Sequence, residues 1–126
     1  MAAILVDTHI FIWARAEPAK LTYGERREFA AASTRYVSAA TIWEIAVLLG
    51  LGRIVGDPGL IDLPPGCQLL PVQPEHCKAL AMLPRYHRDP FDRMLVSQAQ
   101  VERVPLLTRD AAMVAYREHA AILTPP

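Results

Sequence analysis

Short apolar runs, two of which end at an aspartate, constrain the possible folds of this 126-residue chain most strongly. Residues 2–7 read AAILVD, and residues 104–110 read VPLLTRD. Continuous apolar runs of this length are typical of strands that are buried on both faces, as in a parallel sheet. Similar short runs predict further strands over residues 35–39, 68–72 and 120–125.

Segments with helical character separate the apolar runs. They cover residues 8–16, 22–33, 38–52, 74–84, 87–102 and 111–120. Thr22 and Ser38 are suitable N-cap residues, and Gly50 ends the third segment. Because strands that alternate with helices form parallel sheets, we predict a single α/β domain over residues 1–126, with a mostly parallel sheet covered on both faces. Residues 53–67 are rich in Pro and Gly, which predicts a turn-rich connection.

Two of the predicted strands place an acid at their carboxyl end. Asp7 follows the first strand, and Asp110 follows the strand that begins near Val104. In an open parallel sheet, ligands bind in the crevice beyond the carboxyl ends of the strands. The alternative for either residue alone is that it ends the strand or caps the next helix.

Glu44 stands in a segment, TIWEIAVLLGL, that contains no other charged residue. A helix that is apolar nearly all round is predicted to be buried. A carboxylate in such a helix is costly unless it is paired, hydrogen-bonded or bound to a metal. The alternative is that Glu44 lies at the edge of the helix, where it reaches solvent or pairs with an arginine.

The segment HRDPFDRMLVSQAQ contains two aspartates with different expected roles. Asp89 is an N-cap residue before Pro90, and Asp92 at the third helical position favours the helix dipole. Asp92 also lies three and four residues before Leu95 and Val96, which places it on the apolar side of its helix. We therefore predict a capping role for Asp89 and a functional role for Asp92.

Four acids are thus candidates for one site at the end of the sheet: Asp7, Glu44, Asp92 and Asp110. Clustered carboxylates do not all ionise at neutral pH without cations. Hard divalent ions with oxygen ligands, Mg²⁺ or Mn²⁺, are the usual solution, and such sites suit phosphodiester hydrolysis. The His and Cys residues show no zinc spacing.

The same segments resemble a known family. LVDTHIFIW, SAATIWEIAV, HRDPFDRMLVSQA and PLLTRD are similar, in this order, to the blocks of bacterial PIN-domain proteins, and most of all to the VapC-type toxin branch. The resemblance covers almost the whole chain. It implies a three-layer α/β/α sandwich and a Mg²⁺- or Mn²⁺-dependent endoribonuclease that hydrolyses RNA.

The resemblance also implies roles for individual residues and partners. The acidic quartet of the family carries over to Asp7, Glu44, Asp92 and Asp110, with Asp89 and the Thr108 hydroxyl as auxiliary groups. Family members commonly form homodimers. They are usually encoded beside a VapB-like antitoxin whose C-terminal segment blocks the site, often with an arginine.

Two other functions remain as alternatives. One is a phosphoacceptor receiver domain, but such domains need a lysine after a late strand, and the lysines here are Lys20 and Lys78. The other is an inactive PIN module that only binds partners. Because no apolar run reaches the roughly 18 residues of a membrane span, we expect a cytoplasmic protein that does not associate with membranes.

Three further side chains carry expectations that the structure can test. Arg93 lies four residues after Asp89 and is placed to pair with it. Trp43 is expected in the core or at a dimer interface. His87 is expected in a loop, near the site if the resemblance holds.

Overall fold

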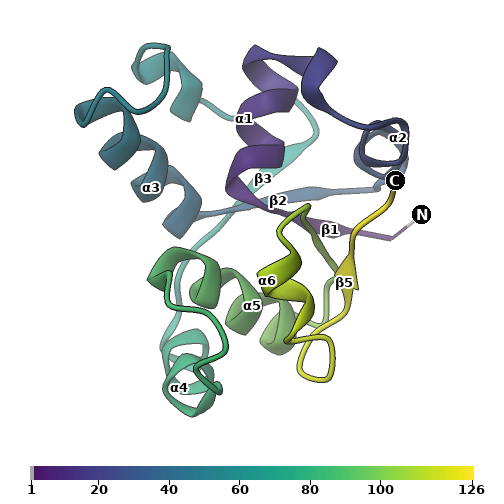
Figure 1. The fold of residues 1–126 in the computed structure, drawn as a ribbon, viewed down its shortest axis with the longest axis vertical. Helices are drawn as coiled ribbons and strands as arrows, with labels where there is room; N and C mark the ends of the chain where they lie inside the picture. Colours follow the sequence, from purple (N-terminus) through teal and green to yellow (C-terminus); the bar gives the residue numbers. More distant parts are fainter. Residues whose placement is uncertain (1) are drawn as a thin grey trace.

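The computed structural model describes residues 2–126, and this part of the chain contains one five-stranded sheet with helices around it (Figure 1). The strands are β1 (Ile4–Val6), β2 (Arg35–Ser38), β3 (Cys67–Leu70), β4 (Leu106–Leu107) and β5 (Ile122–Leu123). They pair in the order β3-β2-β1-β4-β5, and each of these pairs is parallel. The expected parallel sheet is therefore confirmed, with β1 at its centre.

The helices follow the strands in alternation, as the sequence predicts. They are α1 (Thr8–Ala16), α2 (Tyr23–Ala31), α3 (Ala39–Gly50), α4 (Pro74–Met82), α5 (Pro90–Glu102) and α6 (Ala111–Val114). Thr22 and Glu25 form a capping box at the start of α2, and the Ser38 hydroxyl caps α3 by accepting from the Ala40 amide. These local hydrogen bonds fix where each helix begins. Within residues 2–126, no helix is both long and apolar enough to cross a membrane.

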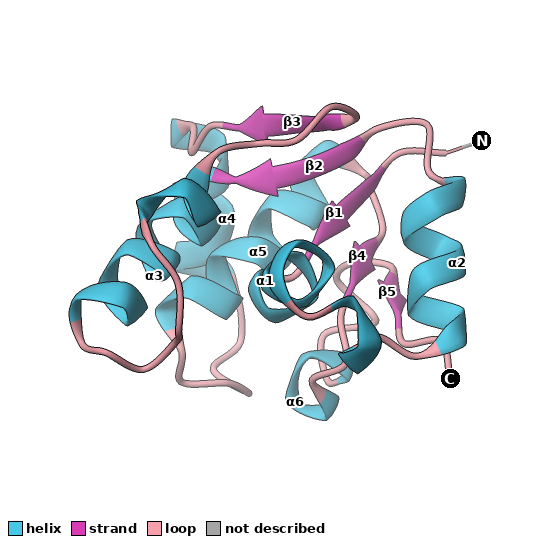
Figure 2. Ribbon diagram, turned by 90° about the horizontal axis from the view of Figure 1, so that it is seen from above, coloured by secondary structure: helices cyan, strands magenta, loops and turns pink. Residues whose placement is uncertain are grey.

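Alternating side chains of the strands build two separate cores on the two faces of the sheet. Leu5 and Leu106 belong to a core with residues of α5, whereas Val6 and Leu107 belong to a core with residues of α1 and α3. Successive residues of a strand point to opposite faces, so a three-residue strand can serve both cores. In Figure 1 the strands lie between α1 and α3 above and α4 and α5 below, and Figure 2 shows the sheet from another side. This is the expected α/β/α sandwich.

The connection over residues 53–67 contains a single short 3₁₀ helix, Pro58–Ile61, in the part of the chain described here. The Asp57 carboxylate starts it by accepting from the Gly59 amide at 2.7 Å. The Arg15 guanidinium of α1 donates to the carbonyl oxygens of Gly59 and Asp62, which attaches the connection to α1. The turn-rich segment is thus anchored by an arginine as well as by apolar packing.

Two elements near the C-terminus are shorter than predicted. The strand expected over residues 104–110 is confined to Leu106–Leu107, and the helix expected over residues 111–120 ends at Val114. After Val114 the backbone forms three-residue turns, such as His119 N–H to Tyr116 C=O. These turns place the buried Tyr116 hydroxyl within 2.7 Å of the Pro84 carbonyl oxygen, a tertiary contact that helical periodicity does not reveal.

The prediction that α3 is buried nearly all round is wrong. Glu44 and Ile45 are buried, but Trp43 is 66% exposed and Val47 is 37% exposed. The helix packs against the sheet with one face and presents a second apolar face at the surface.

The expected pairing of Arg93 with Asp89 is also wrong. Arg93 is 9% exposed, and its guanidinium donates to the carbonyl oxygens of Leu83 and Pro84 and to the Tyr116 hydroxyl. Carbonyl groups left by the end of α4 accept these bonds, so the arginine closes that helix end and the loop after it.

Candidate active site

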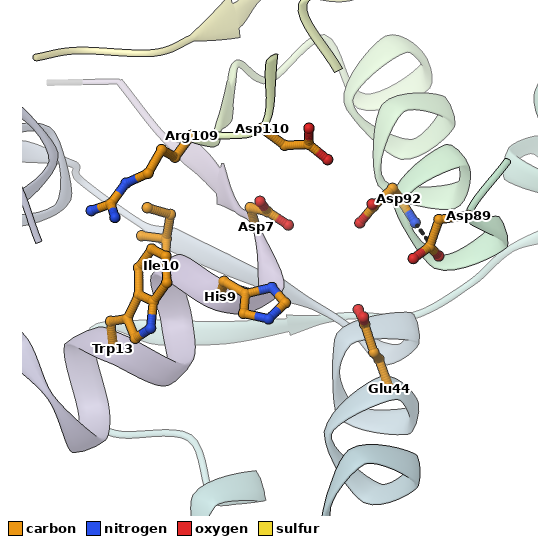
Figure 3. A pocket seen from close by; sticks show the side chains of 9 residues that line it. All are labelled: Asp7, His9, Ile10, Trp13, Glu44, Asp89, Asp92, Arg109 and Asp110. Atoms are coloured by element: carbon orange, nitrogen blue, oxygen red, sulfur yellow. Dashed lines mark hydrogen bonds between the residues drawn. The ribbon is translucent and has the colours of Figure 1, made fainter. Parts of the chain in front are cut away.

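A cavity of about 230 Å³ lies at the carboxyl end of the sheet (Figure 3). Its lining consists of Asp7, His9, Ile10, Trp13, Glu44, Asp89, Asp92, Arg109 and Asp110. All four acids of the predicted quartet are therefore present, together with Asp89. They come from the ends of β1 and β4 and from the first two turns of α3 and α5. The fold brings together residues that are more than 100 positions apart in the sequence.

Asp7 is held rigidly at the end of β1. Its Oδ1 accepts from the Thr8 amide at 2.7 Å, and its Oδ2 accepts from the Thr108 hydroxyl at 2.7 Å. The Thr108 oxygen in turn accepts from the Asp110 amide at 3.0 Å. Burial raises the pKa of Asp7, and the Thr108 hydrogen bond opposes this shift. Thr108 thus connects the acid of β1 to the acid that follows β4.

Glu44 points into the cavity from the second turn of α3 (Figure 3). The residue is 8% exposed, and its Oε1 has no hydrogen-bond partner within residues 2–126. Burial is the main cause that raises its pKa, and the charges of Asp89 and Asp7 raise it further. No arginine pairs with Glu44 within residues 2–126, and its Oε1 atom is buried without a partner.

Asp89 is the N-cap of α5, as predicted, and Asp92 faces the cavity. The Asp89 carboxylate caps α5 by accepting from the amides of Phe91 at 2.8 Å and Asp92 at 3.4 Å. The Asp92 side chain is 15% exposed and faces the other acids (Figure 3). Burial, followed by the charges of Asp7 and Asp89, raises the pKa of Asp92 to about 8. In the absence of a cation, burial and the neighbouring charges therefore favour the protonated form of this carboxyl.

His87 lies in the loop before α5 and contacts the acidic cluster, so the expectation of a loop residue near the site is confirmed, although the sequence assigned it no chemical role. Its Nε2 lies 3.1 Å from Asp92 Oδ2 and 3.1 Å from Asp110 Oδ2. His87, Asp92 and Asp110 each offer one ligand atom within 4.8 Å of the others. The sequence shows only that His87 lies two residues before Asp89. This spacing points to a role once the turn before α5 is known, in which the Asp89 amide donates to His87 Nδ1.

The opposite wall of the cavity carries Arg109, whose guanidinium is paired with a buried glutamate. The Arg109 Nε donates to Glu25 Oε2 at 2.9 Å, and its guanidinium carbon lies 4.3 Å from the centre of the Trp13 ring. The Glu25 side chain is 1% exposed, and its hydrogen bond with Arg109 is the main cause that lowers its pKa. Arg109 therefore links α2 to the end of β4.

The donor set fits a hard divalent cation. Oxygen atoms of carboxylates are the ligands that Mg²⁺ and Mn²⁺ prefer. The unpartnered Glu44 Oε1 and the raised pKa of Asp92 both indicate carboxylates that lack a positive partner. A bound cation would satisfy the first and favour ionisation of the second. Asp7, Glu44, Asp92 and Asp110 are the residues in position to hold it.

Several solved structures share this fold. VapBC2 from Rickettsia felis, bound to a promoter DNA fragment, superposes with a TM-score of 0.69 at 10% identity over 98% of this chain and 99% of that one. A toxin–antitoxin complex from Klebsiella pneumoniae superposes with a TM-score of 0.67 at 16% sequence identity, over 98% of this chain and 98% of that one. VapBC-5 from Mycobacterium tuberculosis superposes with a TM-score of 0.66 at 16% sequence identity, over 98% of this chain and 97% of that one.

The comparison of sequences gives the family. No protein of curated function matches the chain significantly. The family model of the PIN domain matches residues 4–118, a range that includes all four acids of the cavity. The chain belongs to the PIN-domain family.

Proposed function

We propose that this protein is a metal-dependent endoribonuclease and the toxin of a toxin–antitoxin pair. The observation that carries the proposal is the convergence of Asp7, Glu44, Asp92 and Asp110 on one cavity, with a buried oxygen of Glu44 left without a partner. Membership of the PIN-domain family supports nuclease chemistry at this position.

The four acids would hold one or two Mg²⁺ or Mn²⁺ ions. Bound there, such an ion would lower the pKa of a water molecule and neutralise charge on the phosphodiester. The residues of the chain supply the geometry: Thr108 fixes the Asp7 carboxylate, and the Asp89 cap fixes the first turn of α5, which carries Asp92. Since this mechanism uses water as nucleophile, the RNA 2′-hydroxyl takes no part in it.

RNA is the proposed substrate, and one exposed arginine beside the acids suits its phosphates. Arg88 is exposed and directly precedes Asp89, which lines the cavity. Arg109 is less suitable because Glu25 and Trp13 occupy its guanidinium. Phosphate contacts of this kind position a nucleic acid without selecting its sequence.

A VapB-like antitoxin and a second copy of the chain are the proposed protein partners. The solved complexes named above are toxin–antitoxin assemblies of the same fold, which supports the first partner. An arginine from an antitoxin could pair with the carboxylates that otherwise hold metal. The second apolar face of α3, with Trp43 and Val47 exposed, supports a homodimer.

The experiment that tests this function is RNA cleavage by the purified protein, with Mg²⁺, Mn²⁺ or EDTA, followed by mapping of the product ends. We expect cation-dependent cleavage that leaves 5′-phosphate and 3′-hydroxyl ends. The Asp7→Asn variant, purified identically, controls for contaminating nucleases. Products with 2′,3′-cyclic phosphate ends would rule out this mechanism, and cation-independent binding of RNA without cleavage would favour the inactive PIN module.

The receiver-domain alternative has little support. Lys20 lies at the surface, where its Nζ pairs with Glu17 at 2.6 Å, and Lys78 belongs to α4. Neither lysine follows a late strand of the sheet. Failure of the protein to accept a phosphoryl group from acetyl phosphate would agree with this assignment.

A further inference from the structure

His87 bridges two carboxylates that belong to different elements of the fold. Its Nε2 lies 3.1 Å from Oδ2 of Asp92 in the first turn of α5, and 3.1 Å from Oδ2 of Asp110 at the start of α6. The imidazole side chain is 17% exposed, so water competes weakly for these contacts. The same ring atom therefore faces two of the four proposed metal ligands.

The second ring nitrogen determines what Nε2 can do. The Asp89 backbone N–H donates to His87 Nδ1 at 3.2 Å. A neutral imidazole has one donor and one acceptor nitrogen, so an accepting Nδ1 places the proton on Nε2. A nitrogen that carries a proton donates hydrogen bonds and does not bind a cation. In this arrangement His87 is a donor to Asp92 and Asp110.

A network of buried groups holds the loop that carries His87. The His87 backbone N–H donates to the Tyr116 hydroxyl at 2.9 Å, and that hydroxyl donates to the Pro84 carbonyl oxygen at 2.7 Å. Arg93 donates to both the Pro84 oxygen and the Tyr116 hydroxyl. Tyr116 is fully buried, so the backbone of His87 is fixed from the protein interior.

We propose that His87 is a positioning residue of the acidic site. Its Nε2–H holds Oδ2 of Asp92 and Oδ2 of Asp110 in a fixed relation. Oδ1 of Asp110 also accepts from the Ala112 amide at 2.9 Å. Each carboxylate has about four lone-pair sites, so it can accept from His87 and bind metal at once. The inference rests on the proposed function insofar as the cation serves a nuclease, but its effect on cation binding is measurable without RNA.

The test is titration of the purified protein with Mn²⁺, followed by electron paramagnetic resonance, in the wild type and in His87→Ala and His87→Gln. We expect His87→Ala to weaken Mn²⁺ binding by about 10–100-fold, the range typical for hydrogen-bond partners of metal ligands. His87→Gln should recover most of the affinity, because its amide N–H₂ can donate to the same carboxylates. His119→Ala is the matched control, because His119 lines a different surface hollow with Gln100 and Arg103. The Mn²⁺ affinity of this variant should equal that of the wild type.

Two results would overturn the inference. One is equal Mn²⁺ affinity in the wild type and His87→Ala. The other is a directly bound imidazole nitrogen, seen as strong nitrogen modulation in pulsed resonance spectra of the wild type and lost in His87→Gln, because His87 would then be a ligand.

A second variant keeps the test decisive if His87→Ala is poorly folded. Tyr116→Phe retains His87 but removes the hydroxyl that holds its backbone, and it should weaken Mn²⁺ binding by a smaller factor. If His87→Ala is poorly folded, an unchanged Mn²⁺ affinity in folded Tyr116→Phe would refute the inference. If the wild-type protein does not cleave RNA, the proposed nuclease activity is refuted. The effect of His87 on Mn²⁺ binding can still be measured in that case.

Discussion

The Asp89 carboxylate accepts from the backbone amide of Asp92, so the acid that begins α5 also fixes the backbone from which the other acid enters the cavity. Asp89 thus caps the helix, and Asp92, three residues later in the same turn, is the proposed metal ligand. Asp89 can be altered in a way that preserves its cap, and this makes the division of roles testable.

We expect Asp92→Asn to reduce cation-dependent RNA cleavage by about 100-fold or more, beyond the roughly 10–100-fold cost of losing an outer partner of a metal site. Asn cannot offer the anionic oxygen that the cation needs. Asp89→Asn is the matched variant and should lose less than about 10-fold, because Asn caps a helix almost as well as Asp. RNA cleavage rates of both variants test this expectation, and circular dichroism checks that both are folded. Equal losses of cleavage rate in the two variants would show that the roles of Asp89 and Asp92 are assigned wrongly.

The thermal stability of the metal-free protein should fall as the pH rises from about 5 to about 8. The pKa of Asp92 in the folded chain is about 8, and those of Asp7 and Glu44 are also raised. A carboxyl whose pKa is higher in the folded than in the unfolded chain favours folding while it is protonated. That contribution is lost as the pH rises through the folded pKa.

Differential scanning fluorimetry in EDTA measures this dependence. Added Mn²⁺ should raise the midpoint more at pH 8 than at pH 5.5, because metal binding requires the ionised carboxylates. Asp92→Asn should flatten the pH dependence of the metal-free protein. A midpoint in EDTA that rises steadily from pH 5.5 to pH 8 would contradict the expectation.

Arg109→Ala should lower the free energy of unfolding by about 1–3 kcal/mol, the range for removing a charged partner from a buried group. It leaves the Glu25 carboxylate, of which only 1% is exposed, without its guanidinium. Glu25→Gln keeps the side-chain length, and the double variant should cost less than the sum of the two single variants. Urea unfolding at pH 7 measures the coupling, and strict additivity would show that the pair contributes nothing.

Acid should remove the effect of Arg109. The pKa of Glu25 is lower in the folded chain than in the unfolded chain. The ionised carboxylate therefore stabilises the fold at pH values above its pKa in the unfolded chain. This stabilisation disappears as the pH falls through its pKa in the folded chain. The difference between the wild type and Arg109→Ala should therefore shrink below about pH 4. A constant difference across this range would assign the effect to packing of Arg109 on Trp13 instead.

Trp43→Ser should shift the protein from dimer to monomer. The Trp43 ring lies 5.0 Å from that of Phe91, and both line an apolar hollow of about 440 Å³ with Leu80 and Met94. Burial of large aromatic side chains dominates the energy of many interfaces. Light scattering coupled to size-exclusion chromatography gives the mass.

The control for Trp43→Ser is a serine at another exposed aromatic position. Tyr23, on α2, is 75% exposed, so Tyr23→Ser should leave the mass unchanged. A monomeric wild type at micromolar concentration would refute the homodimer, whatever the variants do.

Much of the site was predictable because its positions follow from local patterns. Apolar runs locate β1 and β4, so the acids that follow them must share one end of a parallel sheet. The three- and four-residue spacing of Asp92 to Leu95 and Val96 predicts the direction of its side chain, and the cavity lining confirms it.

The errors have a common physical cause. Arg93 was expected to pair along its own helix, yet the carbonyl groups at the end of α4 need donors, and only tertiary packing brings them near. The helix predicted after Asp110 ends early because Tyr116 must reach the loop before α5. His87 was not given a role because its partners come from two elements that the sequence does not show to be adjacent.

The Thr108–Asp7 hydrogen bond joins residues that are 101 positions apart, and β4 pairs directly with the central β1. During synthesis, the ribosome therefore releases Asp7 long before the residues that complete its surroundings exist. A nascent chain that ends before Thr108 lacks both the hydroxyl that fixes the Asp7 carboxylate and the Asp110 carboxylate, so the complete cavity forms only after β4 and the residues that follow it have been synthesised.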